Sequence, residues 1–434
     1  MASLKIKWRA SLFSMRTSTN YRGKLVFTSK QCFSLLTLKK RERFSILFSR
    51  FNKVELNLNY TMVDSPETLR QLLDCLELYD MAALDTEADS MYHYKTRLCL
   101  IQITVGDSNW LLDPLSDLDI SEIFKTKAMQ ILLLHGADYD LRLLFQKYGF
   151  VPRLVFDTMM AAKLLGKEHL GLSSLVEEYF GITLKKDNQK ADWTIRPLPE
   201  DMKDYAVHDT IYLHELAAKL GEELIACGRM LWHTEICLQL VEHAKKIPLP
   251  KEEPWKITGS KHLPPRSLNL LRALFNWREQ EAEKLDKPPY KILPPDLMLA
   301  IVRAASSTFP ELDLSRLPRL PRRLSGEILD SFEHTLQEAM KVPVEEWPKK
   351  DPRPEPPSVV PDADLLLALK CWRDKKAEQL NIDAAMLGNR TQLITLSLPV
   401  ENDWSKRYNE AGLMAWQQTI WNEILKENIG DSTL

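Results

Sequence analysis

The sequence predicts an α/β domain followed by two all-helical domains, and three observations support this fold class. Between about residues 57 and 220, strand-like and helix-like segments alternate, as is typical of α/β domains. After Leu249 the chain changes to helices separated by prolines, without a convincing strand. A tryptophan-containing helical pattern then occurs twice in this second half. With 434 residues, the chain is long enough for two or three domains that each bury a core.

The alternating part predicts four strands and four helices. Short apolar runs indicate strands, whereas apolar residues at helical spacing with a polar opposite face indicate helices. Strands are expected at residues 82–85, 98–103, 110–112 and 131–134, and helices at about 67–78, 138–148, 172–180 and 201–220. A boundary to the helical half is expected near residues 248–254, where prolines accumulate.

The helical half contains a weak internal repeat. Its first copy has the pattern Trp277-Arg278, Ala282-Glu283 and Leu285, and the second copy has Trp372-Arg373, Ala377-Glu378 and Leu380 at identical spacing. Between the copies, residues 343–361 hold seven prolines among nineteen residues, which favours an extended spacer over a packed core. Two copies of one helical module fit this pattern best.

The expected domain organisation has five parts. They are a basic N-terminal extension at residues 1–55, the α/β domain at 56–245, a first helical domain at 246–345, a proline-rich linker at 346–361 and a second helical domain at 362–430. Residues 1–50 carry twelve Lys or Arg and a single acid, Glu42. This bias is typical of an organellar transit peptide, but a disordered basic tail or a start codon placed too far upstream explains it equally well.

The composition is that of an ordinary globular protein, with 44% hydrophobic and 27% charged residues. A net charge of −2 does not exclude a nucleic-acid partner, because an acidic site can cancel basic surfaces elsewhere. The six cysteines show no zinc or disulfide spacing, so reduced thiols in a cytosol-like compartment are expected. No apolar run approaches the roughly 20 residues that cross a bilayer. We therefore expect a cytoplasmic protein without a membrane partner, or an organellar one if residues 1–50 are a transit peptide.

Two strand ends carry acids that could bind a cation. Asp85 and Glu87 lie two residues apart on a strand, so their side chains point to the same face. Asp138 and Asp140 follow another strand, at the start of a helix, where one of them could instead cap the helix N-terminus. Each pair alone is more typical of surface residues than of a site.

A third segment adds a phenol and another carboxylate. Tyr205 and Asp209 are four residues apart on a predicted helix and therefore share one face. The phenol could orient or deprotonate a water beside the carboxylate. His208 lies about 100° around the helix from Asp209 and is expected to be structural or to face solvent. Alone, this spacing is most often an ordinary helix surface.

Together, in this order, the three segments resemble the three exonuclease motifs of the DEDD superfamily, in its tyrosine-bearing subclass. The related histidine subclass would have His where Asp204 stands. Flanking sequence is similar to ribonuclease D at Ala83-Leu84, Leu100-Ile101-Gln102, Leu134-His135-Gly136, Asp157-Thr158, Val176-Glu177-Glu178-Tyr179, Asp192-Trp193 and Arg196-Pro197-Leu198. The resemblance covers the chain from about residue 57 to its C-terminus. It implies a ribonuclease H-like fold for the α/β domain.

The resemblance also implies a catalytic site. Its metal ligands are Asp85, Glu87, Asp140 and Asp209, and its fifth catalytic residue is Tyr205. Four converging carboxylates repel one another unless cations neutralise them, and oxygen ligands suit Mg²⁺ or Mn²⁺. Two such ions, roughly 3.5 to 4 Å apart, could activate a water and stabilise the leaving 3′-oxygen. The implied products are 5′-nucleoside monophosphates, released from a 3′-hydroxyl end.

Five residues are expected to contact the substrate. They are Gln102, His135, Lys186, Trp193 and Arg196. A tryptophan could stack on a base, and Arg196, the preferred contact, could bind phosphate, as could Lys185 and Lys190. The alternative is that the tryptophan packs the loop and the lysines are merely solvated.

The two helical modules resemble the helicase-and-RNase-D C-terminal (HRDC) domain. Residues 293–304 and 387–398 are similar to its second helix. A role in substrate binding is implied, with purely structural packing as the alternative. Trp277 and Trp372 are expected in helical cores rather than stacked on bases.

Three functions are compatible with these sequence features. The expected one is a 3′–5′ exoribonuclease acting, as a monomer, on tRNA precursors or other structured RNA. A DNA-directed 3′–5′ exonuclease is the first alternative, because proofreading nucleases share this site, and the paired helical modules argue against it. A non-catalytic nucleic-acid-binding protein is the second, and the five intact catalytic positions argue against that.

Overall fold

The computed structural model describes residues 59–184, 188–246, 252–349, 359–399 and 403–429. The predicted N-terminal extension, Lys185 and Lys186 lie outside these described residues, as does much of the predicted proline-rich linker. Among the described residues, no helix has both the length and the apolar character that a membrane span requires.

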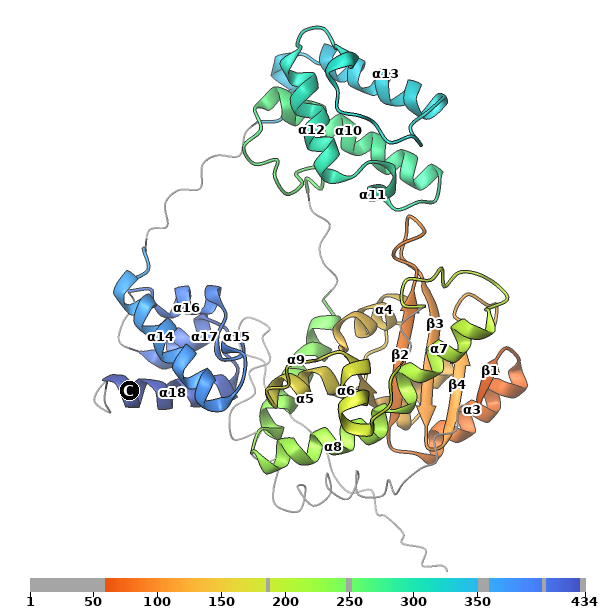
Figure 1. Cartoon of the computed structure of the whole chain (residues 1–434), viewed down its shortest axis with the longest axis vertical. Coiled ribbons are helices and arrows are strands. Elements are labelled where there is room, and N and C mark those ends of the chain that lie inside the picture. The colour runs from red at the N-terminus through yellow and green to blue at the C-terminus, as the bar shows by residue number, and fades with distance from the viewer. Residues whose placement is uncertain (1–58, 185–187, 247–251, 350–358, 400–402, 430–434) are drawn as a thin grey trace, which may run out of the picture. The chain divides into compact units, whose positions relative to one another are not determined.

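A mixed six-stranded sheet forms the centre of the α/β domain (Figure 1). Its strands are β1 (Tyr60–Val63), β2 (Ala82–Ala88), β3 (Leu98–Val105), β4 (Ser108–Leu112), β5 (Ile131–Leu134) and β6 (Leu154–Asp157), in the order β1-β4-β3-β2-β5-β6. Strands β2, β3 and β4 pair antiparallel, whereas β1, β5 and β6 each join a neighbour in parallel. The sequence predicted the four inner strands but not β1 and β6, because four-residue edge strands leave little periodic signal.

Among the described residues, seven α-helices accompany this sheet. They are α3 (Pro66–Leu78), α4 (Asp138–Tyr148), α5 (Thr158–Leu164), α6 (Leu172–Phe180), α7 (Glu200–Ile211), α8 (Leu213–Ala226) and α9 (Met230–Ala244). The helix predicted over 201–220 is interrupted at Tyr212, with no proline or glycine at the break. Tertiary packing explains the interruption, since α7 packs on β2, β3 and β4 while α8 packs on α5 and β5.

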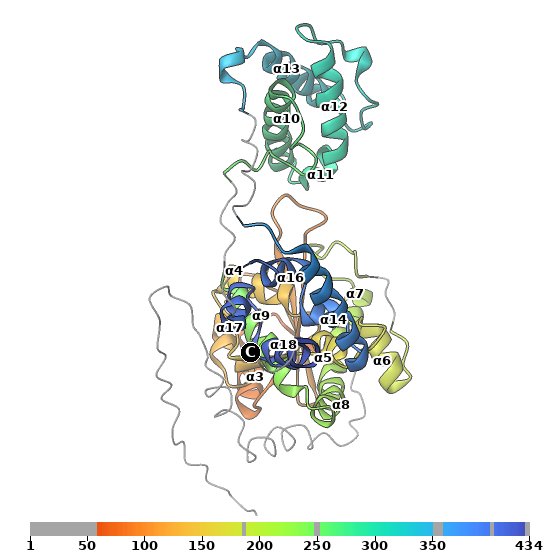
Figure 2. The ribbon, with the colours of Figure 1, turned by 90° about the vertical axis from the view of Figure 1, so that its left-hand side faces the viewer.

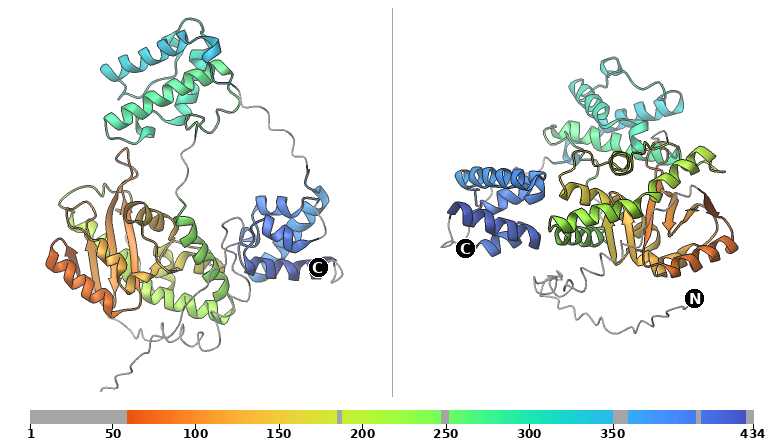
Figure 3. Two further views of the ribbon diagram at one scale, coloured as in Figure 1. Left: turned by 180° about the vertical axis from the view of Figure 1, so that it is seen from behind. Right: turned by 60° about the horizontal axis from the view of Figure 1, so that its bottom comes forward.

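The alternation of side chains gives the two faces of the sheet different partners. On one face, Leu84 and Ile101 pack with Leu141 of α4, and on the other, Leu100 and Leu111 pack with residues of α7. Figure 3 shows the sheet from behind, with α3 lying along it. Because Asp85 and Glu87 alternate with Leu84, they belong to the face that α7 covers.

The described part of the second half contains helices and no strand. The first group is α10 (Pro265–Lys284), α11 (Pro289–Ile292), α12 (Pro295–Ser307) and α13 (Glu327–Lys341), and Figure 2 shows α10, α12 and α13 side by side. The second is α14 (Ala363–Leu380), α15 (Ala384–Leu387), α16 (Arg390–Leu396), α17 (Trp404–Glu410) and α18 (Ala415–Ile429).

The repeated tryptophans differ in burial. Trp277 is buried in the first group, as predicted, with its ring 5.3 Å from that of Phe332 in an edge-to-face contact. Trp372 is only half-buried, so its prediction as a core residue is wrong. The fully buried tryptophan of the second group is Trp421, which donates a hydrogen bond to the Leu387 carbonyl. Equivalent positions of the repeat thus differ in burial, and a tryptophan outside the repeat pattern occupies the core of the second group.

Candidate active site

Four carboxylates come together at one end of β2. Asp85 and Glu87 project from β2, and Asp209 projects from α7, with carboxylate oxygens of the three residues within 4.8 Å of one another. Asp140, in the first turn of α4, is only 6% exposed and accepts a hydrogen bond from the Thr86 hydroxyl. The structure therefore brings together the carboxylates of three segments that are far apart in the sequence.

Local structure explains why Asp85 and Glu87 lie there. Strand β2 pairs antiparallel with β3, and this ladder has a register shift between Glu87 and Ala88. The shift marks a bulge, after which the ladder continues in a new register with Ala88 opposite Leu98. Both acids thus sit at the last regular positions of β2, on the face that α7 covers.

Asp140 and Asp138 have different surroundings, although they are two residues apart. The Asp138 carboxylate pairs with Arg142 one helical turn later and is about half exposed. Neither acid caps the helix, because the residue at the cap position is Ala137 and no side chain caps there. Asp140, and not Asp138, belongs to the cluster.

Asp157 positions the turn that leads into α4. Its buried carboxylate accepts the backbone N–H groups of Gly136 and Ala137, and also those of Met159 and Met160 at the start of α5. Gly136 has φ +76°, a conformation that favours glycine. Sequence reasoning did not assign this role to Asp157, although an acid between a strand and a helix is a known N-cap signal.

The four carboxylates have raised pKa values. Burial, followed by the repulsion of Asp209 and Asp140, raises the pKa of Glu87 to about 9. Burial and its three acidic neighbours raise the pKa of Asp85 well above its usual range. Burial also raises the pKa of Asp140 to about 7, although the Thr86 hydrogen bond lowers it, and that of Asp209 to about 7.

This electrostatic arrangement fits divalent cations. The cluster buries several like charges together, which is unfavourable unless positive charge neutralises them. Its donor set consists of carboxylate oxygens, which Mg²⁺ and Mn²⁺ prefer. The residues present therefore match the chemistry of a site for hard divalent cations.

Tyr205 lies one helical turn before Asp209 on α7 and is half-buried. Burial, then the nearby carboxylates of Asp209 and Glu87, raise the pKa of its phenol above the usual value near 10. In the metal-free site the hydroxyl is therefore protonated at neutral pH and can donate a hydrogen bond. A hydroxyl that donates in this way fits the predicted role of orienting a water, and the role in deprotonation stays a prediction.

The prediction that Trp193 stacks on a base is wrong. Trp193 is only 1% exposed and packs in the core between the sheet and α7. Its ring centroid lies 6.1 Å from that of Tyr205. The tryptophan therefore packs near the Tyr205 ring inside the domain and has almost no exposed surface on which a base could stack.

The prediction that Arg196 contacts phosphate is not supported either. Both nitrogens that face Asp113 form hydrogen bonds with its carboxylate, at 2.6 and 2.7 Å. The remaining N–H groups donate to the backbone carbonyls of Trp193, Ile195 and Cys99. Because all five donors are used within the protein, Arg196 fixes the loop before α7.

Gln102 and His135, two further predicted contacts, and His208, predicted to be structural or to face solvent, lie in different surroundings. Gln102 is fully buried, lies directly opposite Asp85 in the β2–β3 register, and has no hydrogen bond from its amide among the described residues. His135 bonds through Nδ1 with the Thr158 hydroxyl, and burial lowers its pKa, so the ring is neutral. His208 is half-buried and bonds with the Asp204 carbonyl of its own helix, in keeping with a structural role.

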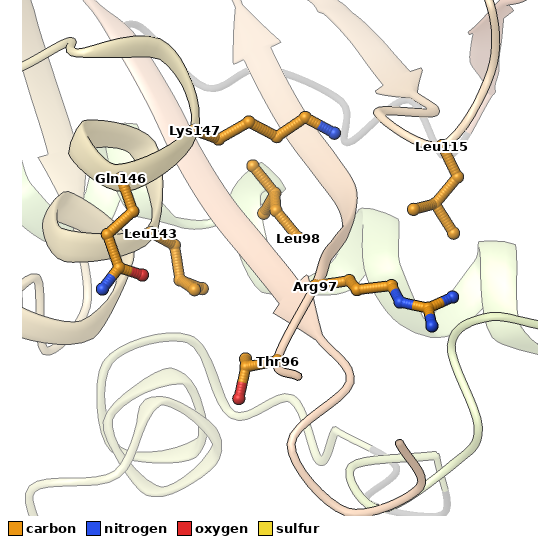
Figure 4. A pocket seen from close by; sticks show the side chains of 7 residues that line it. All are labelled: Thr96, Arg97, Leu98, Leu115, Leu143, Gln146 and Lys147. Carbon is orange, nitrogen blue, oxygen red and sulfur yellow. The ribbon is translucent and has the colours of Figure 1, made fainter. Parts of the chain in front are cut away.

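Two cavities lie near the sheet without containing the carboxylates. The larger, about 340 Å³, lies between the start of β3 and α4, and Figure 4 shows Lys147, Arg97 and Leu98 among its lining side chains. The smaller, about 220 Å³, is lined partly by Asp113, Arg196 and Lys203. None of the four carboxylates lines either cavity. The candidate active site is therefore located by the carboxylate cluster and not by a cavity.

Comparisons with known proteins agree with this site. Residues 60–225 match the family model of a 3′–5′ exonuclease, and residues 267–315 match that of the HRDC domain. Ribonuclease D of Pseudomonas paraeruginosa is 30% identical over 308 residues, covering 69% of this chain and 79% of the relative. Ribonuclease D of Escherichia coli is 28% identical over 345 residues, covering 77% of this chain and 89% of the relative.

Solved structures show the same fold. The crystal structure of Escherichia coli RNase D aligns with a TM-score of 0.59 and 26% identity, covering 85% of this chain and 99% of that one. A protein from Bifidobacterium adolescentis aligns with a TM-score of 0.70 and 22% identity, covering 87% and 98% of the two chains. This chain therefore belongs to the ribonuclease D family of hydrolytic 3′–5′ exoribonucleases.

Proposed function

We propose that this chain removes nucleotides from the 3′-hydroxyl end of RNA at the carboxylate cluster, with two Mg²⁺ or Mn²⁺ ions, and releases 5′-nucleoside monophosphates. The observation that carries the proposal is the convergence of carboxylates from β2, α4 and α7, with pKa values raised by burial and mutual repulsion. Asp85, Glu87, Asp140 and Asp209 would hold the ions. When bound, such ions supply a Lewis acid and a source of hydroxide for phosphodiester hydrolysis.

The residues around the carboxylates have positioning roles in this proposal. The protonated phenol of Tyr205 donates a hydrogen bond that orients the attacking water. The Thr86 hydroxyl holds Asp140 in place, and Asp157 fixes the turn that presents α4. Trp193 limits the movement of Tyr205.

Gln102 is assigned to positioning rather than to substrate contact. It is 0% exposed, so RNA cannot reach it without a rearrangement. Its amide lies in the same cross-strand row as Asp85, beneath α7. A buried amide without hydrogen bonds is costly, and a carboxylate that becomes ionised beside it would supply an acceptor. Gln102 would then orient Asp85 once cations have displaced its proton.

Structured RNA, with tRNA precursors as the expected case, is the proposed substrate class. The Escherichia coli enzyme, which this chain resembles at 26% identity, is described as an exoribonuclease involved in structured RNA processing. The HRDC match at residues 267–315 adds a helical module outside the α/β domain. The domain boundaries, a monomeric state and a cytoplasmic location stay predictions, and an organellar location stays the alternative because residues 1–58 lie outside the described residues.

The direct test compares 5′-labelled RNA and DNA of the same sequence, each with a 3′-hydroxyl, in Mg²⁺ or Mn²⁺. We expect a ladder of RNA products shortened from the 3′ end, 5′-monophosphates in the released fraction and slower cleavage of DNA. Faster cleavage of DNA would favour the DNA-directed alternative. Loss of activity on an RNA with a blocked 3′ end distinguishes an exonuclease from an endonuclease.

The substrate class is tested by truncation after Lys245. If the helical modules hold structured RNA, truncation weakens binding to a tRNA-like substrate more than binding to a short single strand. Cleavage of the short strand continues, because the four carboxylates lie before Leu220. Affinity is measured against salt for both proteins and both RNAs. Equal losses on the two RNAs, or a truncated protein that does not fold, would instead indicate a structural role for the modules.

A further inference from the structure

A second cluster of metal-ligating side chains lies in the α/β domain, apart from the four carboxylates. It consists of Asp89 and His93, from the segment that joins β2 to β3, and Asp192, from the segment that precedes α7. One carboxylate oxygen from each acid and one imidazole nitrogen lie within 4.8 Å of one another. None of the three residues is part of the catalytic site described above.

Asp89 is the most deeply buried of the three side chains. It is only 1% exposed, and its Oδ1 accepts the backbone N–H of Tyr92. Its Oδ2 is in direct ion-pair contact with Nδ1 of His93, so the buried carboxylate and the imidazole already face each other. A buried carboxylate is unfavourable without a hydrogen-bond donor or a cation, and the only side chain of the cluster that compensates this one is the His93 imidazole.

Asp192 is held in place by its own loop. Its Oδ1 accepts hydrogen bonds from the backbone N–H of Thr194 at 3.1 Å and from the Thr194 hydroxyl at 2.6 Å. The carboxylate therefore has a fixed orientation toward His93 and Asp89. A preorganised ligand loses less conformational freedom when a cation binds.

We propose that Asp89, His93 and Asp192 form a binding site for a transition-metal cation, Zn²⁺ or Mn²⁺. One imidazole nitrogen and two carboxylate oxygens are typical ligands of these ions, whereas Mg²⁺ prefers oxygen alone. Water completes the coordination, since His93 and Asp192 are only half-buried. The inference does not rest on the proposed function, because the two sites share no ligand.

The position of the site gives it a structural consequence. Asp89 and His93 follow β2, which carries Asp85 and Glu87, and Asp192 precedes α7, which carries Tyr205 and Asp209. A hydrogen bond from the Tyr92 hydroxyl to the Lys190 carbonyl, at 2.7 Å, already joins the two segments. A cation held by both segments would therefore brace the two elements that bring the catalytic side chains together.

The competing interpretation is an ion pair between His93 and Asp89 without a metal. Cobalt separates the two, because Co²⁺ replaces Zn²⁺ and its visible absorption reports nitrogen and oxygen ligands. We would titrate the full metal-free chain with Co²⁺ in excess Mg²⁺, which competes with Co²⁺ for sites made of carboxylate oxygens alone. His93→Asn and Asp192→Asn test the site, whereas His169→Asn, at an exposed histidine, and Asp209→Asn, in the catalytic cluster, are matched controls.

We expect the wild type and both controls to bind one more tight equivalent of Co²⁺ than His93→Asn and Asp192→Asn, whose affinity should fall by about 100-fold or more. Asp192→Asn keeps an oxygen acceptor for Thr194, so the loop should stay folded in that variant. Zn²⁺ should also slow hydrogen exchange in residues 89–97 and 188–194 of the wild type, but not of His93→Asn. Equal Co²⁺ binding by the wild type and both site variants would overturn the proposal. So would loss of the extra equivalent in Asp209→Asn, which would place it in the catalytic cluster.

Discussion

The end of β2 and the loop before α7 use charge in opposite ways, although both border the same helix. At β2, carboxylates from three elements gather, and burial with mutual repulsion raises their pKa values. In the loop, Arg196 has its five donors satisfied by Asp113 and three backbone carbonyls. Buried charged groups without partners lower the stability of the fold, and proteins keep them where a ligand can compensate the charge. Charged groups with protein partners, such as Arg196, stabilise the fold instead.

The same difference appears within a single turn of α4. Asp138 is half exposed and already paired with Arg142, and Asp140 is buried in the cluster. An exposed pair of this kind contributes little to stability. Asp138 can therefore serve as a control in experiments that test the proposed role of Asp140 and its neighbours in the cluster.

The largest expected effect is the loss of a metal ligand. Asp209→Asn keeps the shape of the side chain but removes its charge, and we expect the catalytic rate to fall by about 10³-fold or more while RNA binding persists. Asp85→Asn should behave alike. The measurement is single-turnover cleavage of a short RNA at saturating Mg²⁺ and Mn²⁺. Asp138→Asn is the control and should retain full activity. Full turnover by Asp209→Asn would rule out the assigned site.

Tyr205→Phe is expected to have a smaller effect, because it removes only the hydrogen bond that orients the water. We expect the catalytic rate to fall by about 10- to 1,000-fold, with little change in RNA affinity. Single-turnover rates and a binding titration separate these two quantities. A variant with an unchanged rate would show that the phenolic hydroxyl has no chemical role.

Arg196→Gln tests the loop before α7, where the charged group has partners within the protein. It removes two charge-assisted hydrogen bonds to the partly buried Asp113, so we expect the free energy of unfolding to fall by about 2 kcal/mol. The rate on a short RNA should change little. Arg70→Gln, which disrupts only an exposed pair with Glu67, is the control and should leave stability nearly unchanged. Unchanged stability combined with weaker RNA binding would restore Arg196 as a substrate contact.

The smallest expected effect is a pH-dependent change in thermal stability. The pKa values of Glu87, about 9, and of Asp140 and Asp209, about 7, lie above the ordinary carboxyl range. Without metal, the folded chain therefore binds more protons than the unfolded chain above about pH 4. The stability that these groups contribute is complete below that pH and is lost as the pH rises through about 7 and 9.

Added Mg²⁺ relieves this repulsion, so it should raise the Tm more at about pH 8 than at about pH 5.5. Differential scanning fluorimetry with and without Mg²⁺ measures the change. Asp209→Asn should show a smaller dependence on pH. An equal increase in Tm at both values would contradict the raised pKa values.

Much of the fold could be predicted because its signals are local. Apolar runs identified β2 to β5, and helical periodicity identified α3, α4 and α6 with nearly the observed bounds. The edge strands β1 and β6 were missed, and the break at Tyr212 was not foreseen. These features depend on which neighbour a segment packs against, and a single sequence does not contain that information.

In the candidate site, too, some features could be predicted from the sequence and others depend on the fold. The sequence by itself determined which acids and which tyrosine occupy the motif positions, because residue type and short spacing are written in the chain. Only the tertiary structure decided that Asp140 is buried while Asp138 is not, that Trp193 and Arg196 are used internally, and that Asp192 meets His93. Burial and hydrogen-bond satisfaction are set by residues distant in sequence, so they exist only after the chain has folded.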